Sequence, residues 1–379
     1  MPIAYTNRVL GVDINTRTMS VRTPVEYVEA TVAILKSKWH KGKLNFIIAD
    51  AEVMTGRLGY LAETSPWLRF MMSLMHVSIA RALKCSEAHL ITTIKGFKHM
   101  LKVANATPPV ATAQEQKFAA SKTASRVHKN SAVRFHITKP LRAEIKLIYR
   151  ALTSDWIDMW RPIGHLIKRS PSAVGYSDSS LHAAGGYSLD MGFWWYIEWP
   201  QEIQRATLRF IYTDANGNLV SINALEYASL IINYVASTYV MTKVAPCPGD
   251  PHPVVLLKAD NRTAESWLIK ASKSSQAGRA LGYVQAAFMI NNPVGINCEH
   301  VTSKDNEIAD KISRIPSERA LPSEMQVVYK EHPSLTYCQR FHPSAELKSL
   351  ILATLLTRSF VDPLELSRTI LASPGEITT

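Results

Sequence analysis

The sequence predicts an α/β protein in which a mostly helical module precedes a mixed five-stranded sheet with flanking helices. In residues 171–320, three strand-like runs follow one another and then alternate with helix-like runs, which is typical of a mixed sheet with helices packed on it. Before residue 171, apolar residues recur at helical spacing behind prolines that mark helix starts. These observations predict a helical module joined to a separate sheet domain.

The first module spans residues 1–104. Residues 8–23 alternate apolar and polar side chains around an Asn-Thr-Arg turn, which predicts a β-hairpin. Three helices are expected after it, at residues 25–39, 49–62 and 66–84. The first and third begin beside Pro24 and Pro66, where a proline fits the first helical turn.

A basic linker and a connecting helix are expected over residues 105–170. The helix is predicted from Pro140 to about Trp156, because apolar residues recur at helical spacing there. The candidate nucleic-acid contacts in the linker are Lys117, Lys122, Arg126, Lys129, Arg134 and Lys139. Cations spaced among small polar residues can follow a phosphate backbone. An ordinary exposed linker has the same composition, so that alternative stays open.

The sheet domain is expected over residues 171–320, and a helical extension over 321–379. Strands are predicted at 173–178, 183–189, 193–199, 254–258 and 295–301, and helices at 223–239, 263–269, 278–289 and 306–313. Gly185 and Gly186 permit close backbone approach within the second strand. Trp194, Trp195 and Trp199 could form a binding platform, but packing in the core is the favoured interpretation.

The charge of the chain is uneven. Residues 1–170 hold 26 Lys and Arg against 11 Asp and Glu, a net charge of +15, whereas the whole chain of 379 residues carries +12. A basic half beside a nearly neutral half suggests a polyanion-binding part joined to a part that carries chemistry. A solvated basic surface would have the same composition.

Several classes of protein are not expected. No apolar run of about 18 residues occurs, so we expect no membrane-spanning helix, and the amino terminus lacks a secretory signal pattern. The cysteines are Cys85, Cys247, Cys298 and Cys338, and none belongs to a Cys-x-x-Cys pair. A zinc site and a disulfide framework are therefore not expected. An intracellular reducing compartment (nucleus, cytoplasm or organelle matrix) fits this cysteine usage.

Four carboxylates carry the candidate chemistry: Asp178, Glu226, Asp260 and Asp310, separated by 48, 34 and 50 residues. Two are expected at strand ends and two on helices, so the fold could bring them to one cleft. Converging carboxylates repel one another unless cations compensate them. Ligation by oxygen alone favours two Mg²⁺ or Mn²⁺ ions, which would support phosphodiester hydrolysis. Each acid alone could instead be a turn residue or a helix cap.

His300 lies at the end of the last predicted strand, near the same cleft. It could shuttle a proton or help product release, although a structural histidine is the favoured interpretation. Asn261 and Arg262 follow Asp260 directly and are further candidates for nucleic-acid contact.

The residues around the four acids resemble the ribonuclease H domain of retrotransposon reverse transcriptases. The similar stretches are Tyr-Ser-Asp178-Ser-Ser, Asn-Ala-Leu-Glu226, Ala-Asp260-Asn-Arg-Thr-Ala and Asn306-Glu-Ile-Ala-Asp310-Lys-Ile-Ser-Arg. The hairpin at 8–23 and the stretch from Thr55 to Arg69 resemble the thumb and connection that follow a polymerase palm. The resemblance spans about residues 8–316.

The resemblance implies a ribonuclease H-like domain behind a thumb/connection-like module. It implies that the four acids bind two metal ions and cut the RNA strand of an RNA–DNA hybrid. No Tyr-x-Asp-Asp-like pattern occurs, so we expect no polymerase activity. Two alternatives remain. The chain could be a domesticated retroelement fragment that binds structured RNA or serves as a structural subunit of a ribonucleoprotein, or it could pair with a polymerase palm on another chain.

Overall fold

The computed structural model describes residues 6–40, 42–92, 134–167, 169–212, 220–244, 250–273, 275–369 and 374–378. The chain divides into two compact units. One consists of Met1–Pro24, Ala62–Met71 and Asp155–Thr379, and the other of Val25–Leu61 and Met72–Ser154. The first unit contains the large sheet and all the predicted carboxylates.

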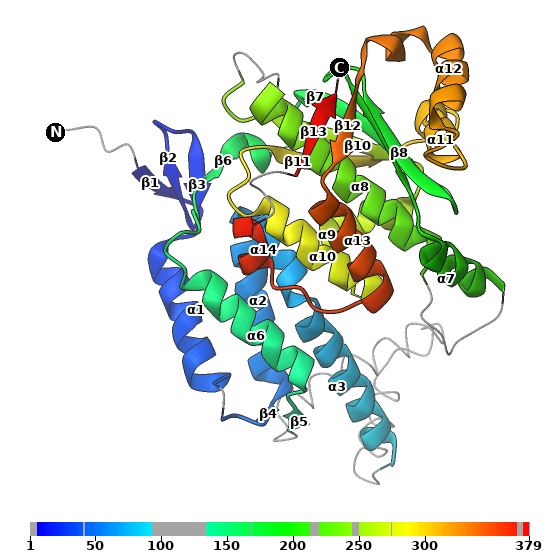
Figure 1. Cartoon of the computed structure of the whole chain (residues 1–379). Helices are drawn as coiled ribbons and strands as arrows, with labels where there is room; N and C mark the ends of the chain where they lie inside the picture. The colour runs from blue at the N-terminus through cyan, green and yellow to red at the C-terminus, as the bar shows by residue number, and fades with distance from the viewer. Residues whose placement is uncertain are drawn as a thin grey trace, which may run out of the picture. The chain divides into compact units, whose positions relative to one another are not determined.

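The unit formed by Val25–Leu61 and Met72–Ser154 is helical. It contains α1 (Val25–Lys38), most of α2 (Ile48–Thr64), α3 (Ser73–Thr92), α6 (Lys139–Leu152) and the short strands β4 (Asn45–Phe46) and β5 (Phe135–His136) (Figure 1). Buried Glu144 on α6 accepts hydrogen bonds from the backbone N–H groups of Leu74 and Met75, each at 2.8 Å. This carboxylate satisfies donors that the first turn of α3 cannot pair internally.

The N-terminal hairpin has one more strand than predicted. β1 (Thr6–Val9), β2 (Val12–Asn15) and β3 (Ser20–Arg22) form an antiparallel sheet, which β6 (Arg161–Pro162) extends. The extra strand arises because the chain turns at Leu10 and Gly11, whose φ angles of 50° and 84° suit a two-residue hairpin turn.

A seven-stranded mixed sheet has the order β11-β10-β7-β8-β9-β12-β13. β7 (Ala173–Ser179), β8 (Ala183–Ser188) and β9 (Phe193–Glu198) are antiparallel neighbours. β10 (Val254–Ala259) pairs in parallel with β7 and with β11 (Gly295–His300). The predicted mixed α/β architecture is confirmed, and these five strands are the five that were predicted.

Helices cover both faces of this sheet. α8 (Ile222–Tyr239) packs on β7, β8 and β10, and with α10 (Gln276–Met289) it contributes to the larger core. α11 (Glu307–Ser313) and α12 (Leu321–Glu331) cover the other face and form a smaller core. The remaining helices of this region are α7 (Gln201–Tyr212), which was not predicted, and α9 (Arg262–Lys270).

Strand β9 shows why the tryptophans are core residues. Trp195 packs in the larger core and Trp194 in the smaller one, because successive side chains of a strand point to opposite faces. Trp194, Trp195 and Trp199 are 6%, 0% and 1% exposed. The favoured interpretation of these residues as core is confirmed.

The C-terminal segment was expected to be helical, and this is wrong for two stretches. β12 (Gln339–Pro343) pairs with β9, and β13 (Gly375–Thr378) pairs with β12, which extends the sheet from five strands to seven. α13 (Ala345–Thr357) and α14 (Pro363–Thr369) lie between them. No helix among the described residues is long and apolar enough to cross a bilayer.

Candidate metal centre

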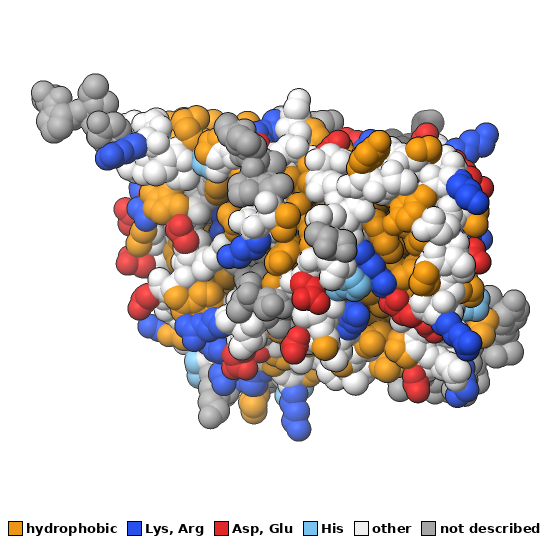
Figure 2. Space-filling model, turned by 45° about the horizontal axis from the view of Figure 1, so that its top comes forward, with side chains coloured by type: hydrophobic (Ala, Val, Ile, Leu, Met, Phe, Trp, Pro, Cys, Tyr) orange, Lys and Arg blue, Asp and Glu red, His pale blue; other side chains and the backbone are white. Residues whose placement is uncertain are grey.

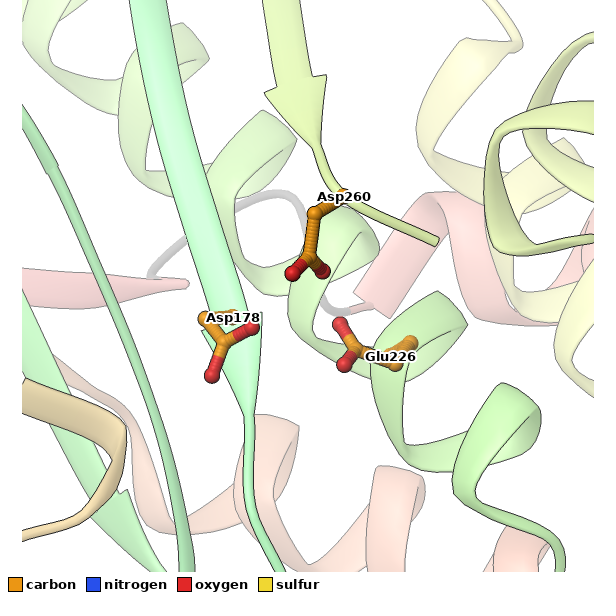
Figure 3. Close-up of side chains that lie close together, drawn as sticks. All are labelled: Asp178, Glu226 and Asp260. Carbon is orange, nitrogen blue, oxygen red and sulfur yellow. The ribbon is translucent and has the colours of Figure 1, made fainter. Parts of the chain in front are cut away.

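Three of the four predicted carboxylates lie together at one edge of the sheet. Asp178 is the penultimate residue of β7, and Asp260 follows β10 directly. Because β7 and β10 are parallel neighbours, their carboxyl ends lie at the same edge. Glu226 reaches this edge from α8, whose amino end is capped by Ser221. Figure 3 shows the three carboxylates turned toward one another.

The three side chains offer oxygen atoms that all lie within 4.8 Å of one another. Two bonds of about 2.1–2.4 Å from a divalent ion span roughly 4.2–4.8 Å, so one ion could contact an oxygen of each acid. Asp178 and Glu226 are buried, whereas Asp260 is half-buried. The cluster therefore has a dry side and a side open to solvent.

The electrostatics of the cluster disfavour three ionised acids without a cation. Burial raises the pKa of Asp178 to about 6, and the negative charges of Asp260 and Asp310 act in the same direction. Burial also raises the pKa of Glu226 well above its usual value, assisted by the charges of Asp178 and Asp260. A bound cation would remove both the repulsion and part of the desolvation cost.

An orphaned oxygen supports the fit of a cation. Glu226 Oε2 is buried and has no hydrogen-bond partner among the described residues. A buried carboxylate oxygen without a donor is costly, and a metal ion is one partner that satisfies it. The donor set, which consists of carboxylate oxygens only, suits a hard divalent ion such as Mg²⁺ or Mn²⁺.

Neighbouring hydroxyl groups hold two of the acids in place. Ser313 Oγ on α11 donates to Asp178 Oδ2 at 2.5 Å, and Ser303 Oγ donates to Asp260 Oδ2 at 2.7 Å. α11 approaches β8 closely because residue 185 is glycine. A Cβ there would lie 2.4 Å from Ile312 Cγ2 and 3.1 Å from the Ser313 nitrogen. The close approach predicted for the glycine pair is confirmed at this position.

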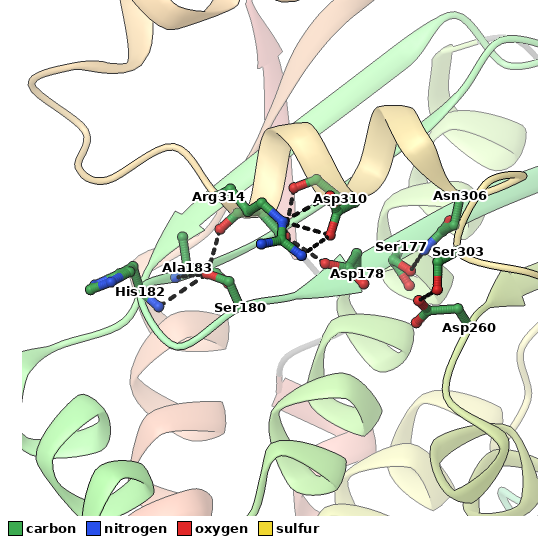
Figure 4. Close-up of polar contacts among 11 residues, drawn as sticks. Ser177, Asp178, Ser180, His182, Ala183, Asp260, Ser303, Asn306, Asp310 and Arg314 are labelled. Carbon is green, nitrogen blue, oxygen red and sulfur yellow. Dashed lines mark hydrogen bonds and ion pairs between the residues drawn. The ribbon is translucent and has the colours of Figure 1, made fainter.

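The fourth predicted acid, Asp310, does not join the cluster of three. It lies on α11, and its carboxylate accepts hydrogen bonds from Arg314 Nε at 2.7 and 2.8 Å (Figure 4). Its negative charge still raises the pKa of both Asp178 and Glu226, so it is close enough to act on them electrostatically. The structure thus brings three of the four predicted carboxylates together and places the fourth beside them in an ion pair.

His300 ends β11, next to β10, at the same sheet edge. Its Nε2 lies 3.1 Å from the main-chain oxygen of Asp260. Because a carbonyl oxygen only accepts, Nε2 carries the hydrogen and Nδ1 is the basic nitrogen. His300 therefore contacts the loop that carries Asp260 and does not contact the carboxylate itself.

The residues predicted to contact nucleic acid differ in their structural settings. Asn261 caps α9, since its Oδ1 accepts from the N–H groups of Thr263 and Ala264. Arg262, Arg134 and Lys139 are exposed. The remaining predicted contacts, Lys117, Lys122, Arg126 and Lys129, lie outside the described residues. On the face shown in Figure 2, basic and acidic side chains are interspersed.

Sequence reasoning missed Ser303, Ser313 and Arg314. Arg314 had a usable signal, because it follows Asp310 by four residues on one helix, a spacing that favours an ion pair. The two serines had none, since their acids lie 43 and 135 residues away in the chain.

No protein-family model, curated protein or solved structure matches this chain.

Proposed function

We propose that this chain is a ribonuclease H-type nuclease that hydrolyses the RNA strand of an RNA–DNA hybrid with two divalent metal ions and without polymerase activity. The observation that carries the proposal is the cluster of Asp178, Glu226 and Asp260 at the carboxyl edge of parallel β7 and β10. Five neighbouring strands of the seven-stranded mixed sheet, in the order β11-β10-β7-β8-β9, also support it, because the resemblance implies a mixed five-stranded sheet.

Asp178, Glu226 and Asp260 would hold the ions, and Asp310 would complete the set after leaving Arg314. Bound ions of this kind supply an activated water and stabilise the leaving oxygen of a phosphodiester. Since Asp260 is the most exposed of the three acids, the substrate phosphate would approach from its side. His300 contacts the Asp260 carbonyl through Nε2, so Nδ1 would be the nitrogen that accepts or gives a proton.

Hybrid recognition follows from the resemblance and from the position of α9. This helix begins at Arg262, two residues after Asp260, so its amino end lies next to the cluster. Exposed Arg262 at this helix start suits a phosphate or a 2′-hydroxyl, whereas the N–H groups of Thr263 and Ala264 are already held by the Asn261 cap. The basic residues of the 105–170 stretch would add contacts to the backbone.

The proposal is tested with an RNA–DNA hybrid that carries a labelled RNA strand. The parent protein is expected to cut the RNA in Mg²⁺ or Mn²⁺ and to be inert in EDTA. Asp260→Asn should reduce the rate by at least about 100-fold, since each ligand supports transition-state charge. Asp155→Asn is the matched control, because Asp155 is an exposed acid outside the cluster.

A second candidate function has one observation in its favour. The ion pair with Arg314 neutralises Asp310, the fourth acid that catalysis would need. This is expected of a fold that binds nucleic acid and does not cut it. In that case the chain would bind hybrid or structured RNA as a subunit of a ribonucleoprotein and would cut neither. Binding of hybrid by the parent without cleavage at any Mg²⁺ concentration would favour this alternative.

A further inference from the structure

A polar cavity lies at the end of β10 and β11 that is opposite to the carboxylate cluster. Its volume is about 190 Å³, and its wall includes Trp67, Arg161, His165 and Gly295. Gly295 begins β11, whereas His300 ends it at the sheet edge that carries the carboxylate cluster. The cavity and the cluster are therefore separated by roughly 16 Å along the strand. All the residues that line this cavity belong to one compact unit.

Three nitrogen atoms around this cavity have no hydrogen-bond partner among the described residues. They are Arg161 Nη2, His165 Nε2 and Trp67 Nε1, and each of these atoms is buried. Arg161 is 6% exposed and Trp67 is 0% exposed. Orphaned buried polar atoms are uncommon and costly, and the Arg161 and Trp67 nitrogens can only donate, so they indicate a ligand that brings acceptors.

Arg161 is the strongest of these groups. No carboxylate lies within 4 Å of its guanidinium in the described part of the chain. Burial lowers the pKa of Arg161, although nearby Asp158 acts in the opposite direction. A buried guanidinium costs several kcal/mol unless an anion compensates it. An oxyanion in the cavity would provide that charge.

His165 and Trp67 add donors but no positive charge. Burial and the neighbouring His252, Arg161 and Arg169 lower the pKa of His165 to about 4, so the ring is neutral at pH 7. The ring sits against Gly295, where a Cβ would lie 2.8 Å from its Cδ2. A neutral imidazole can donate one N–H, and the indole can only donate. Both groups therefore suit an acceptor.

Other polar groups of the wall are engaged with protein partners. Tyr234 donates to the carbonyl oxygen of Val294 at 2.9 Å, and Asn292 donates to that of Phe288 at 2.8 Å. Arg69 and Glu63 also line the cavity, and they pair with each other at 3.4 Å, so their charges compensate. Within the described part of the chain, the buried wall atoms that lack a hydrogen-bond partner are nitrogens, and the charge that lacks an ion pair is the positive charge of Arg161.

We propose that this cavity binds a phosphate group. Its volume far exceeds the roughly 15 Å³ that one buried water needs, so a tetrahedral oxyanion fits. Arginine guanidinium groups recognise phosphate through parallel N–H donors. The phosphate could belong to a free mononucleotide or to a nucleic-acid backbone. The site does not depend on the carboxylate cluster or on its activity.

The test measures phosphate affinity by isothermal titration calorimetry at constant ionic strength, with inorganic phosphate and adenosine 5′-monophosphate as probes. Arg161→Met should weaken binding at least about tenfold, since it removes the charge-assisted hydrogen bonds. This variant should stay folded, because an apolar side chain of similar length replaces an uncompensated buried charge. Gly295→Ala should weaken binding as well, by displacing the His165 ring. Arg319→Met, at an exposed arginine outside the cavity, is the control and should bind as the parent does.

The source of the phosphate is distinguished by hybrid binding measured over a range of salt. If the backbone supplies it, Arg161→Met weakens hybrid binding and lowers the salt slope by about one. If a mononucleotide supplies it, the parent binds the small probes, and Arg161→Met binds the hybrid with the same salt dependence as the parent. Absence of any Arg161-dependent binding of phosphate, nucleotide or hybrid would leave only water in the cavity and overturn the proposal.

Discussion

The guanidinium of Arg314 lies 2.7 Å from the carboxylate of Asp310, four residues earlier in the chain. The carboxylate is one-third exposed and the arginine mostly exposed, so solvent screens the pair and makes it inexpensive to open. The ion pair therefore holds a potential fourth ligand beside the cluster of three without locking it there.

Removing Arg314 should increase the affinity of the cluster for a divalent ion. Arg314→Met leaves Asp310 without its cation, and the added negative potential favours a divalent ion. We expect half-maximal cleavage at a severalfold lower Mg²⁺ concentration than in the parent, with Arg319→Met unchanged. A higher Mg²⁺ requirement in Arg314→Met would show that the arginine serves the reaction itself.

Neutralising a cluster acid should stabilise the metal-free protein. The pKa of Asp178 rises from 3.8 to about 6 on folding, so the folded protein binds more protons than the unfolded chain between these values. The free energy of unfolding of the parent thus falls as pH rises through this range, by about 3 kcal/mol in total. Asp178→Asn has no ionisable group at this position, so its free energy of unfolding should not fall in this way.

In urea titrations with EDTA, Asp178→Asn should be more stable than the parent at pH 7, and the difference should vanish near pH 4. Glu324→Gln, on an exposed acid of α12, should show no such pH-dependent difference. A variant less stable than the parent at pH 7 would mean that the Asp178 carboxylate stabilises the fold.

Metal binding should depend on pH in the opposite sense. Below about pH 6 protons compete with the ion for Asp178, and above it the ionised carboxylate is available. The rise in Tm on adding Mg²⁺ should therefore be small at pH 5 and larger at pH 7.5, and EDTA should reverse it. An equal rise at both pH values would place the ion away from this cluster.

The glycine at position 185 should be essential for the position of α11. Gly185→Ala forces Ile312 and Ser313 away from β8, which we expect to cost about 1–3 kcal/mol and to reduce cleavage. Gly56→Ala is a matched control within α2, because a Cβ there meets nothing within 4 Å. It should stabilise the protein by about 0.5–1 kcal/mol. Equal effects of the two changes, measured by urea denaturation, would contradict the close-packing argument.

The cluster could be predicted because its signals are local. Asp178 and Asp260 stand at the ends of apolar strand-like runs, and parallel neighbours bring such ends together. The ion pair that separates Asp310 from the other acids was not anticipated, because the choice between a metal site and Arg314 depends on how α11 packs on β8.

The remaining surprises depend on contacts between distant segments. β12 reads Gln-Arg-Phe-His-Pro, has no clear alternation and ends in proline, so only its pairing with β9 makes it a strand. Likewise, Trp67, Arg161 and Gly295 are far apart in the chain, and no spacing rule brings them to one cavity. The burial that leaves Trp67 Nε1 and Arg161 Nη2 without partners among the described residues is a property of the folded chain alone.

The most direct measurement of the central claim is cleavage of a labelled RNA–DNA hybrid by the parent and by Asp260→Asn, each with Mg²⁺ and with EDTA. We predict that the parent cuts the RNA strand in Mg²⁺ only and that the variant is at least about 100-fold slower. Equal cleavage by parent and variant, or no cleavage by either, would contradict the assignment of Asp178, Glu226 and Asp260 as a catalytic metal centre.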